Sequence, residues 1–314
     1  MKNARPVAGL GRVKPPALAA RTTPDIERRL GDWARRWLSP LAAELVMFVL
    51  KQGWLALFGG LLLAAIIASK LVWNPDWPLA RYDALLIFAL ATQALFLRYR
   101  LETWEEARVI LLFHLTGTAM EWFKVSAGSW AYPEPAFFKL IGVPLFSGFM
   151  YAAVGSYIAR VIRVFEMRFA PYPPLWITFL LAAAIYGNFF AHHFLPDIRA
   201  GLFAATLLIF ARTRVWFRVR HHPRWMPMPL AALLAALALW VAENVGTATG
   251  TWLYSGQRPD HLVSFAKLGS WYLLLFVAFV SVTLVSRQAL SQKPFRPDPA
   301  TRPRPEPAPP PPAG

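Results

Sequence analysis

The fold is decided by residues 114–151, which read HLTGTAMEWFKVSAGSWAYPEPAFFKLIGVPLFSGFMY. The first part predicts an apolar helix that carries His114, Thr118 and Glu121 at positions i, i+4 and i+7, so all three share one helical face. A loop rich in aromatic residues and proline follows, and a second apolar helix begins near Gly142. Because ionisable groups within an apolar run are costly, we expect them to face a protein interior or a wet cavity.

Part of this stretch occurs a second time further along the chain. The two copies are Glu121-x6-Gly128-x-Trp130-x-Tyr132 and Glu243-x6-Gly250-x-Trp252-x-Tyr254. Each copy stands at the outgoing end of a predicted apolar helix, and a Lys-Leu pair follows both. Weak internal symmetry of this kind is typical of multi-helix membrane proteins, and the sequence therefore predicts an internal repeat.

Composition excludes several classes of protein. Apolar residues make up 56% of the 314 residues and cysteine is absent, which excludes disulfides and thiolate metal sites. A formal net charge of +16 would indicate nucleic acid as the partner of a soluble protein. Here the basic residues lie mainly between apolar segments and in the tails, as on the cytoplasmic side of a membrane protein. We therefore expect membrane lipids as partners and no nucleic acid.

The apolar segments predict an all-α, polytopic transmembrane helix bundle over residues 37–286, with a short amphipathic run at 41–52. A helix that crosses a bilayer needs about 20 mostly apolar residues. The expected spans are Gly53–Val72, Tyr82–Leu97, Val109–Phe123, Gly142–Ile162, Leu175–Phe194, Gly201–Phe217, Pro229–Thr247 and Phe265–Val285. The second and third are short or polar at one edge, and seven spans is the nearest alternative to eight.

Both ends of the chain are expected outside the membrane. Residues 1–36 are basic with few apolar clusters, which predicts a disordered cytoplasmic tail, and no apolar segment follows closely enough for a cleavable signal peptide. Residues 287–314 are rich in proline and predict a second disordered tail. Arginine-rich loops follow the fourth and sixth spans, which indicates an even number of spans with both termini in the cytoplasm.

This topology gathers polar side chains near the extracytoplasmic boundary. At the outer ends of the third, fifth and seventh spans stand Glu121, Lys124, Asn188, His192, His193, Glu243 and Asn244. Both Trp-x-Tyr loops cap the layer. Simpler interpretations exist for most members, since tryptophan and tyrosine anchor helices at membrane boundaries and lysine can extend to head groups. The two histidines, close to Asp197, could equally form an exposed cluster.

The two glutamates are the hardest residues to explain without a site. A carboxylate one turn inside the boundary needs a partner or must be protonated. Two such groups in one cavity would leave one protonated and one charged, which is the arrangement that proton transfer requires. Lys124, one turn from Glu121, could hold Glu121 ionised, so the acid role falls to Glu243. Two glutamates with one or two histidines from three helices could satisfy a metal ion, and the sequence leaves that alternative open. The chain has neither the Glu-x-x-His motif of di-iron bundles nor a phosphate-binding loop, so the prediction names no metal and no cofactor.

The chain resembles a bacterial family of integral membrane proteins, the YoaT-like domain of unknown function 817, over about residues 40–285. The similar runs are GSWAYPEPAFFKLIGVPLFSGFMYAAVGSYI, NFFAHHFLPD and AENVGTATGTWLY. This resemblance implies a multi-pass protein of the bacterial cytoplasmic (inner) membrane and brings no established activity.

A more distant resemblance is to membrane carotenoid cyclases and hydratases. These carry an acidic residue, then Trp-x-Tyr, a glycine and a Pro-Leu-Glu-Glu segment at the head of the next helix. The residues that stand in those places are Glu121, Trp130, Tyr132, Gly142 and Pro144-Leu145. Phe146-Ser147 replaces the Glu-Glu pair, so the resemblance implies a shared fold and puts cyclisation itself in doubt.

These residues favour an enzyme that acts on a lipid-soluble, isoprenoid-like substrate at the extracytoplasmic side. Glu121 and Glu243 would exchange the proton and His192 would relay it, while aromatic faces would suit a developing carbocation. The substrate would be bound by Trp130, Tyr132, Asn188, Asn244, Trp252, Tyr254, Lys124 and His193. A small-molecule transporter, or a membrane binding or assembly protein, is the alternative, and the sequence leaves enzyme and transporter both open.

Overall fold

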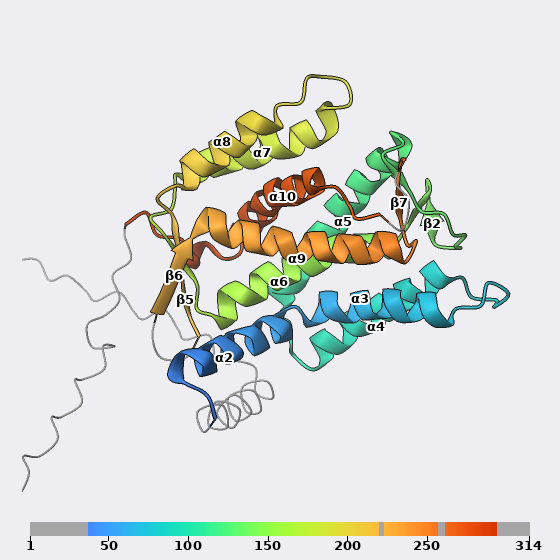
Figure 1. The fold of residues 1–314 in the computed structure, drawn as a ribbon, viewed down its shortest axis with the longest axis horizontal. Helices are drawn as coiled ribbons and strands as arrows, with labels where there is room; N and C mark the ends of the chain where they lie inside the picture. Colours follow the sequence, from blue (N-terminus) through green and yellow to red (C-terminus); the bar gives the residue numbers. More distant parts are fainter. Residues whose placement is uncertain (1–36, 220–222, 257–260, 294–314) are drawn as a thin grey trace, which may run out of the picture.

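The computed structural model describes residues 37–219, 223–256 and 261–293, and this part of the chain is mostly helical (Figure 1). Its α-helices are α2 (Pro40–Leu55), α3 (Leu57–Val72), α4 (Arg81–Arg98), α5 (Trp104–Ser126), α6 (Ser147–Val164), α7 (Leu175–Ala191), α8 (Arg199–Phe210), α9 (Met228–Ala248) and α10 (Phe265–Thr283). The predicted helical fold is therefore confirmed. The predicted N-terminal tail and most of the C-terminal tail lie outside the described residues.

A helix lies at each of the predicted spans, but the sixth differs from the prediction. Helix α8 has 12 residues and ends at Phe210, whereas the predicted span continued to Phe217. The segment Arg214–Arg218 forms strand β5 instead, with side chains alternately exposed and buried over its first four residues. That alternation has the two-residue period of a strand, which a count of apolar residues alone does not detect.

Two helices, α9 and α10, are long and apolar enough to cross a membrane, and a third span results if α2 and α3, bent by 69°, are one broken span. Helices α7 and α8 are apolar but shorter, and α4, α5 and α6 are less apolar. The chain is thus a helical integral membrane protein, and the number of eight spans stays a prediction.

A buried arginine holds the break between α2 and α3. A helix end leaves backbone carbonyl groups without partners inside the helix. Arg160 of α6, only 2% exposed, donates from Nη1 to the Leu55 carbonyl at 3.2 Å and from Nη2 to the Trp54 carbonyl at 3.1 Å. The bend thereby keeps its hydrogen bonds, and α6 is fastened against it.

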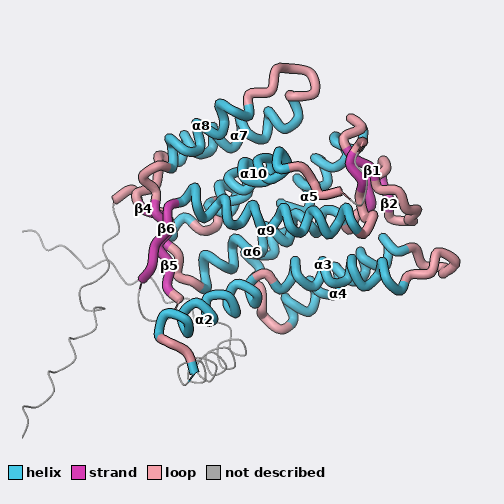
Figure 2. The backbone as a smooth tube through the Cα atoms, in the orientation of Figure 1, coloured by secondary structure: helices cyan, strands magenta, loops and turns pink. Residues whose placement is uncertain are grey.

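Short antiparallel strands, which the all-α prediction did not include, close both ends of the helix bundle (Figure 2). At one end β4 (Arg168–Ala170), β5 (Arg214–Arg218) and β6 (Pro223–Pro227) form a sheet in that order. At the opposite end β1 (Trp130–Ala131) pairs with β7 (Leu253–Tyr254), and β2 (Lys139–Leu140) pairs with β3 (Val143–Pro144).

The chain after α10 packs onto the three-stranded sheet. Leu290 forms a β-bridge with Phe169, and the Ser291 amide donates to the Phe169 carbonyl at 3.0 Å. The Tyr172 amide in turn donates to the Ser291 carbonyl at 2.7 Å. The start of the predicted C-terminal tail, as far as Lys293, is therefore attached to the folded part of the chain.

The two ends of the bundle collect the loops that the predicted topology assigns to the two sides of the membrane. Segments that follow α6, α8 and α10 meet in or beside the β4–β5–β6 sheet, and those that follow α5 and α9 meet in the β1–β7 pair (Figure 1). In the absence of native cysteine, Arg212→Cys and Asp76→Cys give one exposed label site at each end.

We expect a membrane-impermeant maleimide to label Asp76→Cys in intact cells and Arg212→Cys only after the membrane is opened, because the arginine-rich loops face the cytoplasm. The extent of labelling is read by mass spectrometry. Equal labelling of both variants in intact cells would show that the predicted orientation is wrong.

Candidate functional site

Glu121, near the end of α5, is almost completely buried and is surrounded by hydrogen-bond donors. The indole Nε1 of Trp130 donates to Oε2 at 2.7 Å, and the Tyr132 hydroxyl donates to the same oxygen at 2.9 Å. The hydroxyl of Tyr151, from α6, donates to Oε1 at 2.5 Å. These side-chain donors thus replace the hydrogen bonds to water that a carboxylate loses on burial.

Glu243, near the end of α9, has the same surroundings. The Trp252 indole and the Tyr254 hydroxyl both donate to Oε1, at 2.7 and 2.5 Å. Trp271 of the following helix, α10, lines the same cavity, and its ring centre lies 6.3 Å from that of Tyr151. In both copies, therefore, a glutamate is held by the tryptophan and tyrosine of its own motif, and an aromatic residue of the next helix lines the same cavity.

The glycine of each motif turns the chain back toward its glutamate. Gly128 and Gly250 have φ angles of +69° and +64°, a left-handed conformation that is most accessible to glycine. In the first copy the Ser129 amide donates to the Lys124 carbonyl at 2.9 Å, and the second copy has the same bond at 3.0 Å. Both helices therefore end in a Schellman turn that sends the Trp-x-Tyr segment back along the helix.

The two motifs meet in the β1–β7 pair. Trp130 lies opposite Tyr254 in the antiparallel register, and Ala131 lies opposite Leu253. The rings of Trp130 and Tyr254 pack edge to face, with centroids 5.7 Å apart and an angle of 82° between the ring planes. Each glutamate thus binds a loop that also pairs with the loop bound by the other glutamate.

Burial keeps the phenols in the donating form. It raises the pKa of Tyr132 well above its ordinary value, and the neighbouring Glu121 raises it further. The pKa of Tyr254 is raised in the same way by burial and by Glu243. Both hydroxyls therefore carry their protons at neutral pH and can donate them to the carboxylates in hydrogen bonds.

Both carboxyl groups line one cavity of about 880 Å³. Its walls are mostly apolar and come from α2, α3, α6, α7, α9 and α10. Of the predicted site residues, those that line it are Glu121, Lys124, Trp130, Tyr132, Asn188, His192, Glu243, Trp252 and Tyr254. The residues that the sequence placed on three helices and two loops thus lie around one cavity, apart from the two described next.

Two predicted site residues do not line this cavity. Asn244 donates to the Trp240 carbonyl at 2.7 Å and accepts from the Val263 amide at 2.8 Å, so its side chain fastens the segment before α10. His193 is exposed, and its Nε2 lies 3.0 Å from Nζ of Lys124. Because an ammonium only donates, this contact requires that His193 accepts.

The predicted support of Glu121 by Lys124 is wrong in this structure. Lys124 Nζ contacts His193 and lies 4.1 Å from the centre of the Phe189 ring, and no ion pair joins it to a carboxylate among the described residues. A spacing of three residues on a helix permits contact, but the donors around Glu121 already occupy the carboxylate.

Asn188 and His192 are hydrogen-bonded, but the bond joins the His192 ring to the Asn188 backbone and not to its side chain. Nδ1 of His192 lies 3.0 Å from the Asn188 carbonyl, so we assign the ring proton to Nδ1, which leaves Nε2 as an acceptor. The Asn188 side chain donates to Asp197 at 3.1 Å and braces the loop before α8. The side chain of Arg199 hydrogen-bonds Asp197 and holds the pKa of that carboxyl well below its usual range.

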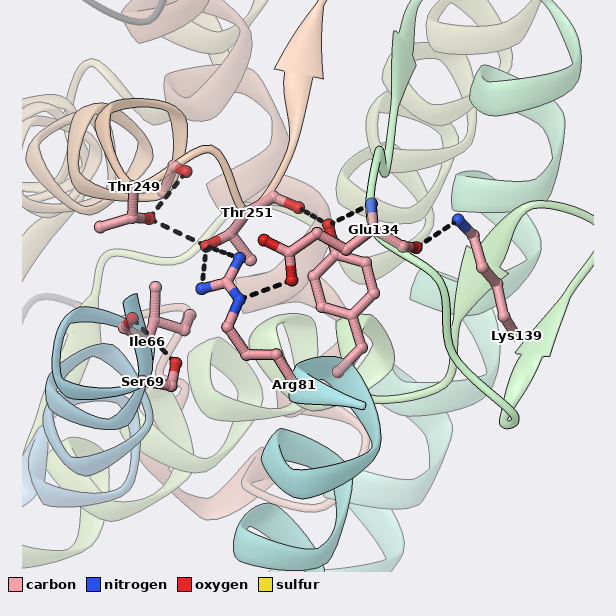
Figure 3. Close-up of polar contacts among 9 residues, drawn as sticks. Ile66, Ser69, Arg81, Glu134, Lys139, Thr249 and Thr251 are labelled. Carbon is pink, nitrogen blue, oxygen red and sulfur yellow. Dashed lines mark hydrogen bonds and ion pairs between the residues drawn. The ribbon is translucent and has the colours of Figure 1, made fainter. Parts of the chain in front are cut away.

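A second polar cluster braces the β1–β7 end of the cavity (Figure 3). Arg81, buried at the start of α4, donates from Nε to Glu134 at 2.7 Å and from both Nη atoms to the Thr251 hydroxyl at 3.4–3.5 Å. Tyr82 donates to the Thr251 carbonyl at 2.7 Å, and Lys139 donates to the Glu134 carbonyl at 2.9 Å. Helix α4 thereby ties the loop after α5 to the loop after α9.

Sequence reasoning missed three of the residues that hold the site. Arg81 had a signal, because it stands at the polar edge of the second predicted span. Tyr151 and Trp271 had none, since each lies on a separate helix outside the repeated motif. Within residues 37–219, 223–256 and 261–293, no three histidine, aspartate or glutamate side chains are grouped so that they could hold a metal ion.

The close contact between Gly246 and Trp252 provides a test of the second motif. A Cβ atom added at Gly246 would lie 1.8 Å from the Trp252 ring, whereas one added at Gly187 of α7 would meet nothing within 4 Å. Gly246→Ala should therefore displace the indole from Glu243 and lower stability by about 2 kcal/mol or more. Gly187→Ala is the matched control and should be neutral or slightly stabilising, because alanine is the better helix former.

Thermal unfolding of the purified protein in detergent measures both glycine variants. Similar unfolding temperatures for Gly246→Ala and Gly187→Ala would show that the Trp252 position is not needed for stability.

Comparisons with known proteins relate the chain to a defined family. The model of the family described as "Protein of unknown function (DUF817)" matches residues 44–279. A protein of Bacillus subtilis (strain 168), "Uncharacterized protein YoaT", is 40% identical over 252 residues, which are 80% of this chain and 94% of that protein.

Two solved structures also align with part of the chain. A cross-linked trimer of MvINS has 16% identity and a TM-score of 0.44, covering 59% of this chain and 95% of that one. MvINS from Mycobacterium vanbaalenii, described as a mycobacterial Insig homolog, has 14% identity and a TM-score of 0.42, covering 60% and 97%. The family match and the 40% identity together show that the chain belongs to the DUF817 family.

Proposed function

We propose that the protein binds a lipid-soluble, isoprenoid-like molecule in the cavity and acts on it by acid–base chemistry. The observation that carries this proposal is a mostly apolar space of about 880 Å³ that is lined by two buried carboxyl groups. Ligand pockets commonly measure about 300–1,000 Å³ and combine apolar walls with a few polar groups. Apolar walls favour an apolar molecule, and the glutamates supply groups that can exchange a proton with it.

The lysine contacts suggest which glutamate accepts a proton and which donates one. Nζ of Lys267 lies 3.8 Å from the centre of the Tyr254 ring, and the hydroxyl of Tyr254 donates to Glu243. A nearby opposite charge favours the ionised form of a carboxyl group. Lys124 contacts His193 instead of Glu121. We therefore assign proton acceptance to Glu243 and proton donation to Glu121, which reverses the roles expected from sequence. The acceptor nitrogen of His192, at the same cavity, suits a relay.

The repeated motif supports the proposed internal repeat. Both copies end a helix in the same turn and bind a glutamate with the same two aromatic residues. Two related halves around one cavity would place one carboxyl group from each half at the ligand. The extracytoplasmic location of this end follows the predicted topology and is part of the proposal.

The proposal takes its substrate class from the distant likeness to carotenoid cyclases, but it does not include the cyclisation reaction. Phe146 stands where those enzymes carry the first of two glutamates, and here it is completely buried. Its ring packs against Tyr82 and Tyr132, with centroids 5.3 and 6.3 Å away. An aromatic core residue at this position cannot supply the carboxyl group that cyclisation in that family would use.

Ligand binding or transport without chemistry is the second candidate. It is favoured by the hydrogen bonds of the glutamates, since each carboxyl group already fixes a Trp-x-Tyr loop and thereby has a structural role. A membrane assembly role would need the proline-rich tail, which lies mostly outside the described residues. A first experiment separates chemistry from binding alone, and a second tests whether the cavity is occupied.

Glu121→Gln tests the chemistry with little damage to the fold. Its amide oxygen can accept from Trp130 and Tyr132, and its amide nitrogen can donate to the Tyr151 hydroxyl, which is able to accept. We expect stability within about 1 kcal/mol of the native protein and turnover lower by roughly a hundredfold.

Mass spectrometry of lipid extracts measures this effect before the substrate is known. Cells with Glu121→Gln should give the same lipid extract as cells that lack the gene. Cells with Glu105→Gln, the same substitution at an exposed position of α5 outside the cavity lining, should give the native extract. A native extract from Glu121→Gln cells would exclude the acid–base role of this residue.

Ala235→Trp tests occupancy of the cavity. Ala235 of α9 lines the space, and a large ring there would fill part of it. We expect at least a tenfold decrease in the lipid-soluble molecule that co-purifies with the protein, quantified by mass spectrometry. Ala183→Trp, on an exposed position of α7 outside the cavity lining, is the control and should retain the molecule. Equal amounts in both variants would mean that the molecule binds elsewhere.

A further inference from the structure

One end of the cavity carries more positive charge than acid–base chemistry on a neutral lipid requires. Lys124 of α5, Lys267 of α10 and Arg199 of α8 all line it. The three cations act on one another, since Lys267 and Arg199 are both close enough to influence the charge of Lys124. Three helices thus direct cationic side chains to the same end of one space.

The two lysines lack ion-pair partners in the part of the chain that the structure describes. Nζ of Lys267 lies 3.8 Å from the centre of the Tyr254 ring and 5.8 Å from that of Trp130. Nζ of Lys124 lies 3.0 Å from a nitrogen of His193. Contacts of this kind position an ammonium group, but they do not neutralise it as a carboxylate would.

The nearby acids are already engaged with other groups. Glu121 and Glu243 accept hydrogen bonds from tryptophan and tyrosine. Asp197 accepts from Asn188 and forms an ion pair with Arg199 at 2.5 Å. Glu243 and Asp197 lie near enough to act on Lys267 and Lys124, but neither acid forms an ion pair with these lysines. A buried or half-buried ammonium without a direct ion pair is costly, so an anion from outside the chain would relieve the cost at this end of the cavity.

The opposite end of the cavity is apolar and lies far along the bundle. Phe217 of β5 and Met226 of β6 line it there, while Trp130 of β1 and Tyr254 of β7 line it at the cationic end. Because β1–β7 and β4–β6 close opposite ends of the bundle (Figure 1), the space extends along the helices. A long apolar chain fits such a shape better than a compact molecule does.

We propose that the cavity takes an amphiphile with an anionic head group, which is bound between Lys124 and Lys267 beside Arg199. The tail lies along the apolar part toward the three-stranded sheet. Ser129 and Ser270 also line the cavity. This inference rests on the proposed function for the presence of a lipid-soluble ligand in the cavity, and it adds the charge of that ligand.

Two probes with the same tail and different heads test the proposal. The native protein, in nanodiscs of phosphatidylcholine, is titrated with dodecyl phosphate and with 1-dodecanol, and binding is followed by the rise in unfolding temperature. We expect dodecyl phosphate to bind at least tenfold more tightly. Lys124→Gln combined with Lys267→Gln should remove that preference and leave the affinity for 1-dodecanol unchanged. The two single variants, expected to be intermediate, replace the double variant if it does not fold.

Lys70→Gln is the matched control, because Lys70 is an exposed lysine of α3 that does not line the cavity. It should keep the native preference. Equal affinities of the native protein for the two probes, or a lysine variant that still prefers dodecyl phosphate, would overturn the anionic head while leaving the proposed function intact. Binding of neither probe would overturn the proposed function as well.

Two further measurements define the source of the anion. Inorganic phosphate alone should bind at least a hundredfold more weakly than dodecyl phosphate, and equal binding would overturn the amphiphile in favour of a simple anion site. Phosphatidylglycerol added to the nanodiscs should compete with dodecyl phosphate if the head group belongs to a membrane lipid. Lack of competition, with dodecyl phosphate still bound, identifies a single-chain amphiphile; either result supports an anionic head.

Discussion

The hydrogen-bonding requirement of two buried carboxyl groups determines how one end of this protein is built. A glutamate that is 2% exposed, or 6% in the second copy, must receive donors from the protein because water is excluded. Tryptophan and tyrosine provide them after the chain has turned back at a glycine. The returning segments are then extended and close together, so they pair as β1 and β7. The loops that satisfy the two glutamates therefore also join the helices that carry them.

The helices could be predicted from sequence because their signal is local. Each apolar run is long enough to be recognised, and α9 and α10 match the predicted spans within about two residues. The strand Arg214–Arg218 was missed, since a short alternating pattern next to an apolar run was counted as part of it. The break between α2 and α3, at Ala56, lies three residues beyond the predicted start of the first span at Gly53, so its position was predicted only approximately. It depends on Arg160, which is 105 residues from Leu55 in the chain, and no local pattern reveals that contact.

The same distinction explains which part of the site was predicted. Glu121, Trp130 and Tyr132 lie within twelve residues of one another, and the repetition of their spacing reveals a shared geometry. Tyr151, Trp271 and Arg81 reach the site from other helices, so their roles depend on how the helices pack. Lys267 was visible as a charged residue in an apolar helix, but head-group contact was its simplest interpretation. Only the packing of α10 against α9 places it beside the aromatic rings that line the cavity.

The separation of lysine and glutamate at the cavity is informative because the same end of the bundle contains a close ion pair. Arg81 and Glu134 are 2.7 Å apart and have no cavity role beyond bracing the loops. A fold that needed only stability could join Lys267 to Glu243 in the same manner, which would remove the cost of an unpaired ammonium. Here the glutamates are held by neutral donors and the lysines by aromatic rings. That arrangement keeps acidic and basic groups apart on one cavity wall, where each is positioned to act on a ligand.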